Sequence, residues 1–275
     1  MSKASVSSTT IEKKRKRETK DADKPKAAQL EEGIPQVDEG SSKKKKRRRN
    51  KQIVEEVNDD GKKDGVDESI GKMDGRLLAD FFAQQAKRSN DELTAVELSD
   101  LYIPEQAFLD TSSWDSSRKI DDLPAFLKKH TPSKGSPLSK AADENGSPHT
   151  LVVTLAGLRA ADLTRALRTF QNQNSAVGKL FAKHIKLKEA KEYVAKTRMG
   201  MGVGTPARIS DLINADVLKL EHLKRIVIDA SYIDQKKRGI FDMKEVFIPL
   251  LQLLTRADLR DRYTSKDEKV HILVF

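Results

Sequence analysis

An aspartate at the end of a buried apolar run is the residue of this sequence whose type and position best suit chemistry. The run Ile226-Val227-Ile228 is followed by Asp229 and then by Ala230-Ser231-Tyr232. A carboxylate at the carboxyl end of a buried strand lies where α/β proteins usually bind ligands. In phosphotransfer enzymes such an aspartate holds magnesium and a neighbouring acid positions water, but this sequence lacks the second acid. Two interpretations remain open: a metal ligand, or a structural carboxylate that caps the following turn.

A second segment that suits ligand binding runs from Gly202 to Ile209, where a predicted strand ends and a helix begins. Thr205 suits the N-cap, and Pro206 suits the first helical position, where its missing amide costs nothing. The free amides of a helix N-terminus favour an anion such as a phosphate. The alternative is an ordinary, well-capped helix start.

Three arginines add positive charge near the same region. Arg159 follows an earlier apolar run, and Arg165 and Arg168 come later on the next predicted helix. These side chains could contact a phosphate chain. The alternative is a solvated basic face of a helix.

A phosphate-binding loop for ATP is absent from the sequence. Such a loop reads Gly-x-x-x-x-Gly-Lys-Ser/Thr, because successive backbone amides must surround the phosphates while the lysine neutralises them. The three Gly-Lys pairs begin at Gly61, Gly71 and Gly178; none has a glycine five positions earlier and none is followed by Ser or Thr. There is no cysteine and the five histidines are scattered. We therefore expect no enzymatic activity, no catalytic residue, no metal site and no cofactor.

Alternating apolar and amphipathic segments predict the fold that positions these residues. Five short apolar runs are separated by helical patterns, which is typical of a parallel α/β sheet covered by helices on both faces. The expected strands lie at Leu151–Leu155, Val177–Phe181, Met199–Val203, Ile226–Ile228 and Val270–Phe275.

Two helices are expected before this sheet. Leu77, Leu78, Phe81 and Phe82 have the spacing of one helical face, so a helix begins at Gly75. Ser89 and Glu92 match a capping box for a second helix. The chain is therefore divided into a disordered charged tail (1–70), a short helical extension (71–130), a surface linker (131–148) and the α/β domain (149–275).

The positive charge of the chain is concentrated in the tail. The formal charge is +10, and residues 1–51 contain 17 Lys and Arg against 8 Asp and Glu. Such a segment suits nuclear or nucleolar import and diffuse RNA contact, and a merely solubilising role is the alternative. We expect no membrane insertion, because no long apolar run exists. The two basic runs consist of Lys13, Lys14, Arg15, Lys16 and Arg17, and of Lys43, Lys44, Lys45, Lys46, Arg47, Arg48 and Arg49.

Three segments resemble, in order and spacing, the first RecA-like domain of DEAD-box RNA helicases: Leu151–Arg159, Val203–Arg208 and Ile226–Asp229. The resemblance implies a single RecA-like sheet and RNA-facing roles for Arg159, Thr205 and Arg208, with Pro206 in the same segment. Ala207 replaces the family's glycine, Ala230 replaces the catalytic glutamate and Tyr232 replaces the final aspartate. These departures, with the missing phosphate loop and second RecA-like domain, imply a domain kept for binding.

A closer resemblance is to the Cms/CMSS family. It is carried by the basic tail and by Leu93–Leu98, Trp114–Phe126, Lys179–His184, Gly204–Ile209 and Ile228-Asp229. That family is associated with the early small-subunit pre-ribosome in the nucleolus. The resemblance therefore implies pre-ribosomal RNA and small-subunit assembly factors as partners, and a location in the nucleus and nucleolus.

The sequence thus predicts a non-catalytic assembly factor of the small-subunit processome that binds RNA, assembly proteins or both. Two alternatives remain: an ATP-dependent RNA helicase with an atypical site, and a scaffold whose sheet edge binds only protein. We expect no small-molecule substrate.

Overall fold

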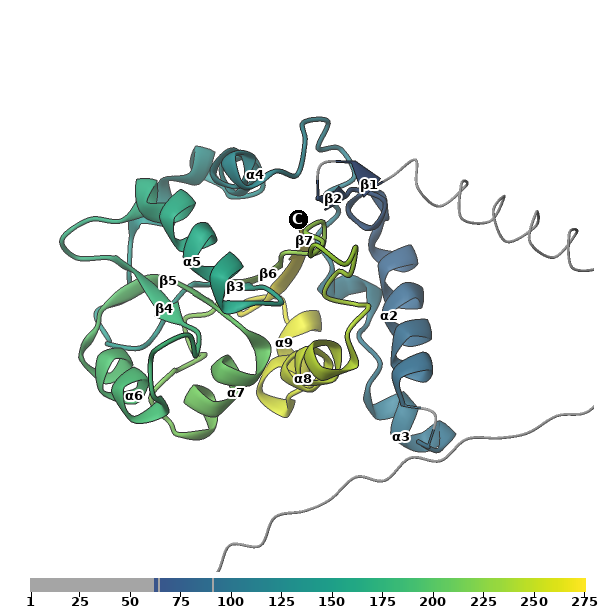
Figure 1. Ribbon diagram of the computed structural model, residues 1–275. Coiled ribbons are helices and arrows are strands. Elements are labelled where there is room, and N and C mark those ends of the chain that lie inside the picture. Colours follow the sequence, from purple (N-terminus) through teal and green to yellow (C-terminus); the bar gives the residue numbers. More distant parts are fainter. Residues whose placement is uncertain (1–61, 64, 91) are drawn as a thin grey trace, which may run out of the picture. The chain divides into compact units, whose positions relative to one another are not determined.

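The computed structural model describes residues 62–63, 65–90 and 92–275 (Figure 1). Both basic runs of the tail lie outside these residues, so their disorder and their role stay predictions. Within the described part of the chain, no helix is long and apolar enough to span a bilayer.

A five-stranded sheet lies at the centre of the fold, in the order β4-β5-β3-β6-β7. All four neighbouring pairs are parallel. Each of the five predicted strands is present, because an almost fully apolar run is stable where both faces of a sheet are covered. The strands are β3 (Thr150–Val153), β4 (Ala176–Leu180), β5 (Met199–Gly204), β6 (Arg225–Ile228) and β7 (His271–Val274).

Helices cover both faces of this sheet, as predicted (Figure 1). Alternate strand residues enter two separate cores: Val152 and Val227 pack with α4, α5 and η5, whereas Leu151 and Ile226 pack with the other helices. The chain therefore has the expected RecA-like α/β fold. The first face carries α4 (Leu123–Lys129), α5 (Gly157–Ala166) and the 3-10 helices η4 (Ser133–Ser139) and η5 (Leu167–Phe170); the second carries α2 (Gly75–Ser89), α6 (Leu187–Lys196), α7 (Pro206–Asn214), α8 (Lys244–Leu254) and α9 (Ala257–Thr264).

The second predicted helix begins later than expected. Ser89 is the last residue of α2 and caps nothing, so the predicted capping box at Ser89 and Glu92 is wrong. The helix α3 (Ala95–Asp100) is capped instead by Thr94 and Glu97, whose side chains bond to each other's backbone amides at 3.3 and 2.8 Å. The remaining short elements are the 3-10 helices η1 (Ile70–Lys72), η2 (Glu105–Ala107) and η3 (Ile120–Asp122).

Residues 131–148, expected as a surface linker, are partly built into the domain. Leu138 is fully buried in the core that also contains residues of α4, α5 and η5. Gly146 donates a backbone hydrogen bond to Thr197 and accepts one from Lys219. Its φ is +69° and an added Cβ would lie 2.2 Å from the Val217 carbonyl oxygen, so only glycine fits. The Ser, Pro, Gly and Lys content of this segment predicts a linker, but its burial and its hydrogen bonds to distant residues determine its conformation.

The last residues of the predicted disordered tail also have a defined structure. The strands β1 (Lys62–Lys63) and β2 (Val66–Asp67) form a short hairpin. We call residues 65–72 the N-terminal strap. Its Asp67 amide donates to Ser231 at 2.7 Å, and the Ile233 amide donates to Gly65 at 3.1 Å. The prediction of disorder is therefore wrong for residues 65–70, because the backbone pairs with the loop that follows β6.

His149 gives the fold a specific dependence on pH. Burial and the positive charge of Arg225 lower the pKa of His149 from 6.5 to about 4. The unfolded chain therefore takes up a proton as the pH falls below 6.5, whereas the folded protein does so only near pH 4. Stability falls across that window. We expect His149 to account for a loss of about 2–3 kcal/mol between pH 7 and pH 4.5.

Urea unfolding of the wild type and the His149→Gln variant at both pH values measures this loss. The variant should show a smaller drop, and the exposed His222→Gln variant should behave as the wild type. Equal drops in the wild type and the His149→Gln variant would contradict the assignment.

Candidate functional site

The candidate site residues meet at one edge of the sheet. Val153 pairs in register with Gly204 of β5 and with Ile228 of β6. The residues that follow these three, Thr154, Thr205 and Asp229, therefore all leave the sheet at its carboxyl ends, which we call the carboxyl edge. Parallel sheets bind their ligands at this edge.

Asp229 forms a closed set of contacts inside the protein. Its side chain is 1% exposed and accepts hydrogen bonds from the Thr154 hydroxyl at 2.7 Å and from Arg159 Nε and Nη2 at 3.0 and 2.9 Å. The two guanidinium bonds reach different carboxylate oxygens, which is the strong bidentate geometry. Asp229 is thus the partner of an arginine, and the prediction of a turn cap is not what the structure shows.

Metal binding at this carboxylate finds no support in its surroundings. Within the described ranges, no group of three or more His, Asp or Glu side chains could hold a metal ion. The nearest cationic group is already Arg159, which neutralises the charge that a metal would need.

Arg159 lies between Asp229 and an aromatic ring. Its guanidinium carbon is 4.5 Å from the centroid of the Tyr232 ring, and its side chain is only 12% exposed. Burial opposes its positive charge, but the hydrogen bonds and the charge of Asp229 outweigh burial and raise the pKa of Arg159. Arg159 therefore holds Asp229 and the loop that carries Tyr232 next to each other. A direct contact of Arg159 with RNA stays a prediction.

The segment around Thr205 forms the start of α7. Pro206 is buried at the first helical position, as expected. Thr205 occupies the N-cap position, but its side chain makes no hydrogen bond to the helix amides, so the predicted side-chain cap is absent. Arg208 donates from Nη1 to the Ile185 carbonyl at 3.1 Å and thereby ties α7 to the loop after β4. Ala207 is exposed beside it.

The other two predicted arginines lie on the solvent side of their helices. Arg165 pairs with Asp162 at 2.7 Å, and the two side chains are 65% and 44% exposed. Arg168 is exposed on η5. Neither joins the cluster around Asp229, which fits the alternative of a solvated basic face.

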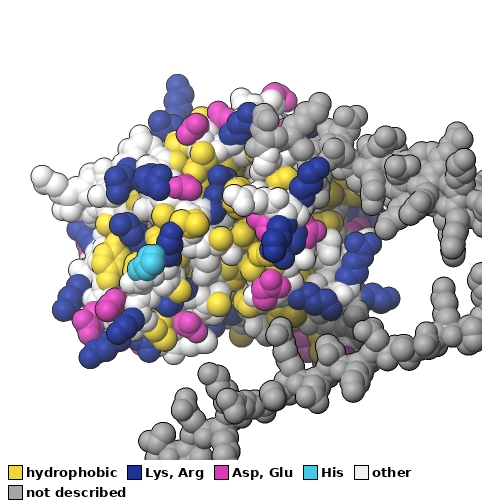
Figure 2. All heavy atoms as spheres, in the orientation of Figure 1, with side chains coloured by type: hydrophobic (Ala, Val, Ile, Leu, Met, Phe, Trp, Pro, Cys, Tyr) yellow, Lys and Arg dark blue, Asp and Glu magenta, His cyan; other side chains and the backbone are white. Residues whose placement is uncertain are grey.

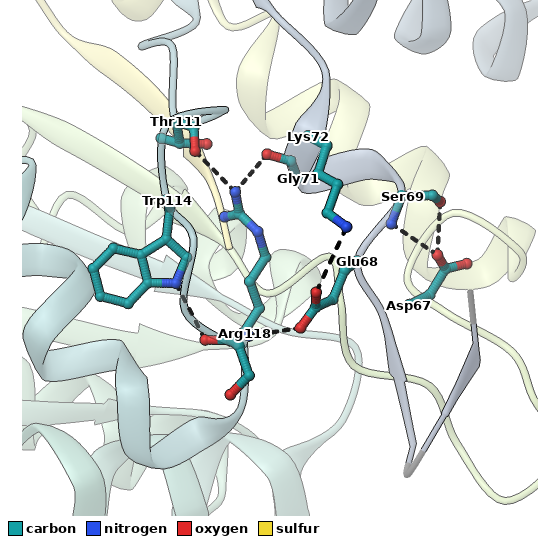
Figure 3. A network of polar contacts seen from close by, with 9 residues as sticks. Asp67, Glu68, Ser69, Gly71, Lys72, Thr111, Trp114 and Arg118 are labelled. Carbon is teal, nitrogen blue, oxygen red and sulfur yellow. Dashed lines mark hydrogen bonds and ion pairs between the residues drawn. The ribbon is translucent and has the colours of Figure 1, made fainter. Parts of the chain in front are cut away.

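Arg118, which no sequence pattern indicated, joins several segments near this edge, and Figure 3 shows its guanidinium bound to Gly71 and Thr111. Its side chain is buried and donates to the carbonyls of Gly71, Thr111 (3.0 Å) and Val274 (2.7 Å). The Ser231 hydroxyl donates to its backbone carbonyl at 3.1 Å. Burial lowers the pKa of Arg118 to about 10, so it is still charged at neutral pH.

The surface around the site is mixed in charge. Figure 2 shows Lys and Arg side chains interspersed with Asp and Glu over this face, with basic side chains beside a histidine over the region of β4. Strong, diffuse attraction of a polyanion is therefore not expected on this face. Any anion binding there must come from a few positioned side chains.

Comparisons with known proteins show which family the chain belongs to. The chain is 53% identical over 208 residues to Protein CMS1 of Chaetomium thermophilum, which covers 76% of this chain and 82% of that protein. It is 32% identical over 193 residues to Protein cms1 of Schizosaccharomyces pombe (70% and 68%) and 31% identical over 192 residues to human Protein CMSS1 (70% and 62%).

A solved structure of Saccharomyces cerevisiae Dbp5 L327V bound to Nup159, Gle1 H337R, IP6 and ADP aligns with a TM-score of 0.35 at 15% identity, over 58% of this chain and 42% of that one. The strand order of the sheet, and not this alignment, carries the fold assignment. A family model described as "CMS1: U3-containing 90S pre-ribosomal complex subunit" matches residues 8–275. The chain therefore belongs to the CMS1 family.

Proposed function

We propose that this protein is a non-catalytic subunit of the early small-subunit pre-ribosome, whose folded domain binds RNA at the carboxyl edge of its sheet. Membership in a family described as a subunit of the U3-containing 90S pre-ribosomal complex supports a role in ribosome biogenesis. Pre-ribosomal RNA and small-subunit assembly factors are the partners we infer. The nucleus and nucleolus are the places of action, with the basic runs of the tail as import signals and electrostatic anchors.

The contacts of Asp229 carry the non-catalytic part of this proposal. Both of its carboxylate oxygens are bound by Arg159, and one also accepts from Thr154. An aspartate that serves ATP hydrolysis must present an oxygen to magnesium or to a magnesium-bound water. Asp229 could do so only by giving up a buried ion pair. The helicase alternative thus requires the loss of contacts that hold the edge together.

The position of Thr205, Pro206 and Arg208 supports the RNA-binding part. The first amides of α7 point out of the carboxyl edge and lack a side-chain cap, and Arg208 brings a cation to the same place. Free helix amides and a nearby guanidinium are groups that bind phosphate. A domain with these groups suits a phosphodiester backbone.

In-cell RNA crosslinking followed by sequencing tests the proposal. We expect pre-ribosomal RNA sites for the intact chain and for a variant lacking residues 1–61. We expect at least a tenfold loss of those sites in the Thr205→Ala, Arg208→Ala double variant. The variant removes a cation and also the hydrogen bond by which Arg208 holds the loop after β4. The truncation must end before the N-terminal strap, because residues 65–72 contact Arg118 and Ser231.

The matched control replaces a threonine and an arginine on another surface, Thr264→Ala with Arg260→Ala on α9. This variant should crosslink as the wild type does. If removal of residues 1–61 abolishes all crosslinks and the Thr205 and Arg208 variant changes nothing, the folded domain is a protein-binding scaffold and RNA contact belongs to the tail. RNA-stimulated ATPase activity of the purified chain would overturn the non-catalytic assignment.

A further inference from the structure

The loop after β4 contains a tight turn that presents basic side chains at the carboxyl edge. The Ile185 amide donates to the Ala182 carbonyl at 3.2 Å and closes the turn over Lys183 and His184. His184 has a φ of +61°, a left-handed conformation that costs a residue with a Cβ about 1 kcal/mol or more. Both Lys183 and His184 are exposed. The surrounding contacts must therefore hold this turn in its shape.

Two neighbouring elements fix the turn. Arg208 of α7 donates to the Ile185 carbonyl at 3.1 Å. On the other side, a Cβ added to Gly157 at the start of α5 would lie 3.2 Å from Lys183 Cβ, so the turn packs directly against this helix. The turn thus lies between the starts of α5 and α7, at the same edge as Asp229 and Thr205.

The lysines of this loop carry charge that the protein itself does not neutralise. Lys183 and Lys186 of the loop and Lys188 at the start of α6 are exposed, and no ion pair recorded among the described residues includes any of them. The Glu189 carboxylate accepts a hydrogen bond from the Lys186 backbone amide at 3.2 Å. By contrast, Arg159 and Arg165 are both paired with aspartates. The positive charge available to a ligand at the carboxyl edge therefore resides mainly in the loop after β4.

An exposed apolar side chain follows the glycine of α5 against which Lys183 packs. Leu158 follows Gly157 at the start of α5 and is 62% exposed, one of the largest exposures of a large apolar side chain in the described part of the chain. A base that is not paired can pack on such a surface, whereas a duplex keeps its bases stacked inside. Lysines with an adjacent apolar contact suit a single strand better than a helix of RNA.

We propose that the turn Ala182–Ile185 with Lys186 is a phosphate-binding element for single-stranded RNA, with Lys183 and Lys186 as the phosphate contacts and Arg208 as the residue that positions the turn. This assignment rests on the proposed RNA-binding function and names the side chains that perform it. It places the main phosphate contacts on the loop after β4, beside the start of α7.

The salt dependence of RNA binding measures the contribution of these lysines. The full chain is titrated with a fluorescently labelled oligouridylate at several salt concentrations. The slope of log K against log salt concentration is negative, and each phosphate contact on a single strand adds about 0.7 to its size. The Lys183→Gln, Lys186→Gln variant should therefore reduce the size of the slope by about 1.4. The Lys183→Arg, Lys186→Arg variant should retain it.

The matched control removes two charges from the opposite edge of the sheet. Lys196 lies near the end of α6 before β5, and Lys224 directly precedes β6, and both are exposed. The Lys196→Gln, Lys224→Gln variant should leave the slope unchanged. An equal fall of the slope in both double variants would overturn the proposal, because net charge alone would then explain it.

Ultraviolet crosslinking of the same complexes, with mapping of the crosslinked peptides, separates this inference from the proposed function. Crosslinks in residues 180–188 that disappear in the glutamine variant support the proposal. Crosslinks in the folded domain that avoid this loop overturn the proposal and leave the RNA-binding function standing. Crosslinks confined to residues 1–61 overturn both.

Discussion

The Asp229→Ala variant is expected to lose about 3–5 kcal/mol of unfolding free energy, because it leaves the charge of Arg159 buried without its partner. Arg159 is 12% exposed in its side chain and has both of its described carboxylate bonds to Asp229. The Thr154 hydroxyl, which is buried, also loses its acceptor. Urea denaturation followed by circular dichroism measures the loss.

An exposed ion pair on the neighbouring helix is the matched control. Asp162 pairs with Arg165 near the surface, and Asp162→Ala should cost less than about 1 kcal/mol. Replacing both buried partners, Arg159→Met with Asp229→Leu, should cost less than Asp229→Ala alone, because no unpaired charge remains. If Asp229→Ala and Asp162→Ala cost the same, the buried pair does not hold the carboxyl edge together.

The sheet and its candidate edge could be predicted because local pattern and global fold agree there. A strand covered on both faces must be apolar throughout, and the short apolar runs at Leu151, Met199 and Ile226 therefore predict buried strands. Parallel pairing then brings the residues after these runs together without any further information. The sequence predicts that Asp229 follows one buried strand and that Thr205 follows another, and the parallel pairing of the structure brings both to one edge.

The pairing of Arg159 with Asp229 could not be predicted in the same way. The sequence suggests a phosphate chain or a solvated helix face for Arg159, and a metal ion or the following turn for Asp229. Only the positions of side chains separated by 70 residues show that they bind each other. A buried salt bridge is a tertiary interaction, and spacing along the chain carries no record of it.

The wrong helix cap has a different physical origin. Two neighbouring segments, Ser89 to Glu92 and Thr94 to Glu97, both have the spacing of a capping box. Packing of Ala86 and Phe82 in the core continues α2 through Ser89, so only the second segment is free to start a helix. Where two local signals are equal, burial of the neighbouring residues decides between them.

The Arg118→Ala variant should lose about 3–5 kcal/mol of unfolding free energy as well, and it should release the N-terminal strap. The side chain donates to three carbonyls from separate segments, and its guanidinium lies 5.4 Å from the centroid of the Phe126 ring. Truncation leaves a cavity and takes the donor from the buried Gly71 carbonyl, whereas the Val274 and Thr111 carbonyls keep bonds from the Thr111 hydroxyl and the Trp114 amide. Arg118→Lys should recover little, because one ammonium cannot reach three carbonyls that a planar guanidinium reaches together.

Hydrogen exchange shows whether Arg118 holds the strap or only fills space. The Asp67 and Ile233 amides bond across the strap and the loop after β6, and both should lose protection in Arg118→Ala. Amides of β3, in the centre of the sheet, should lose protection only as far as global stability falls. In the exposed Arg168→Ala variant, the opening free energies of the strap amides and of the β3 amides should each change by no more than about 0.5 kcal/mol. The loop after β6 also carries Tyr232, whose ring lies against the Arg159 guanidinium. If the Asp67 and Ile233 amides stay protected in Arg118→Ala, Arg118 does not hold the strap or this part of the carboxyl edge.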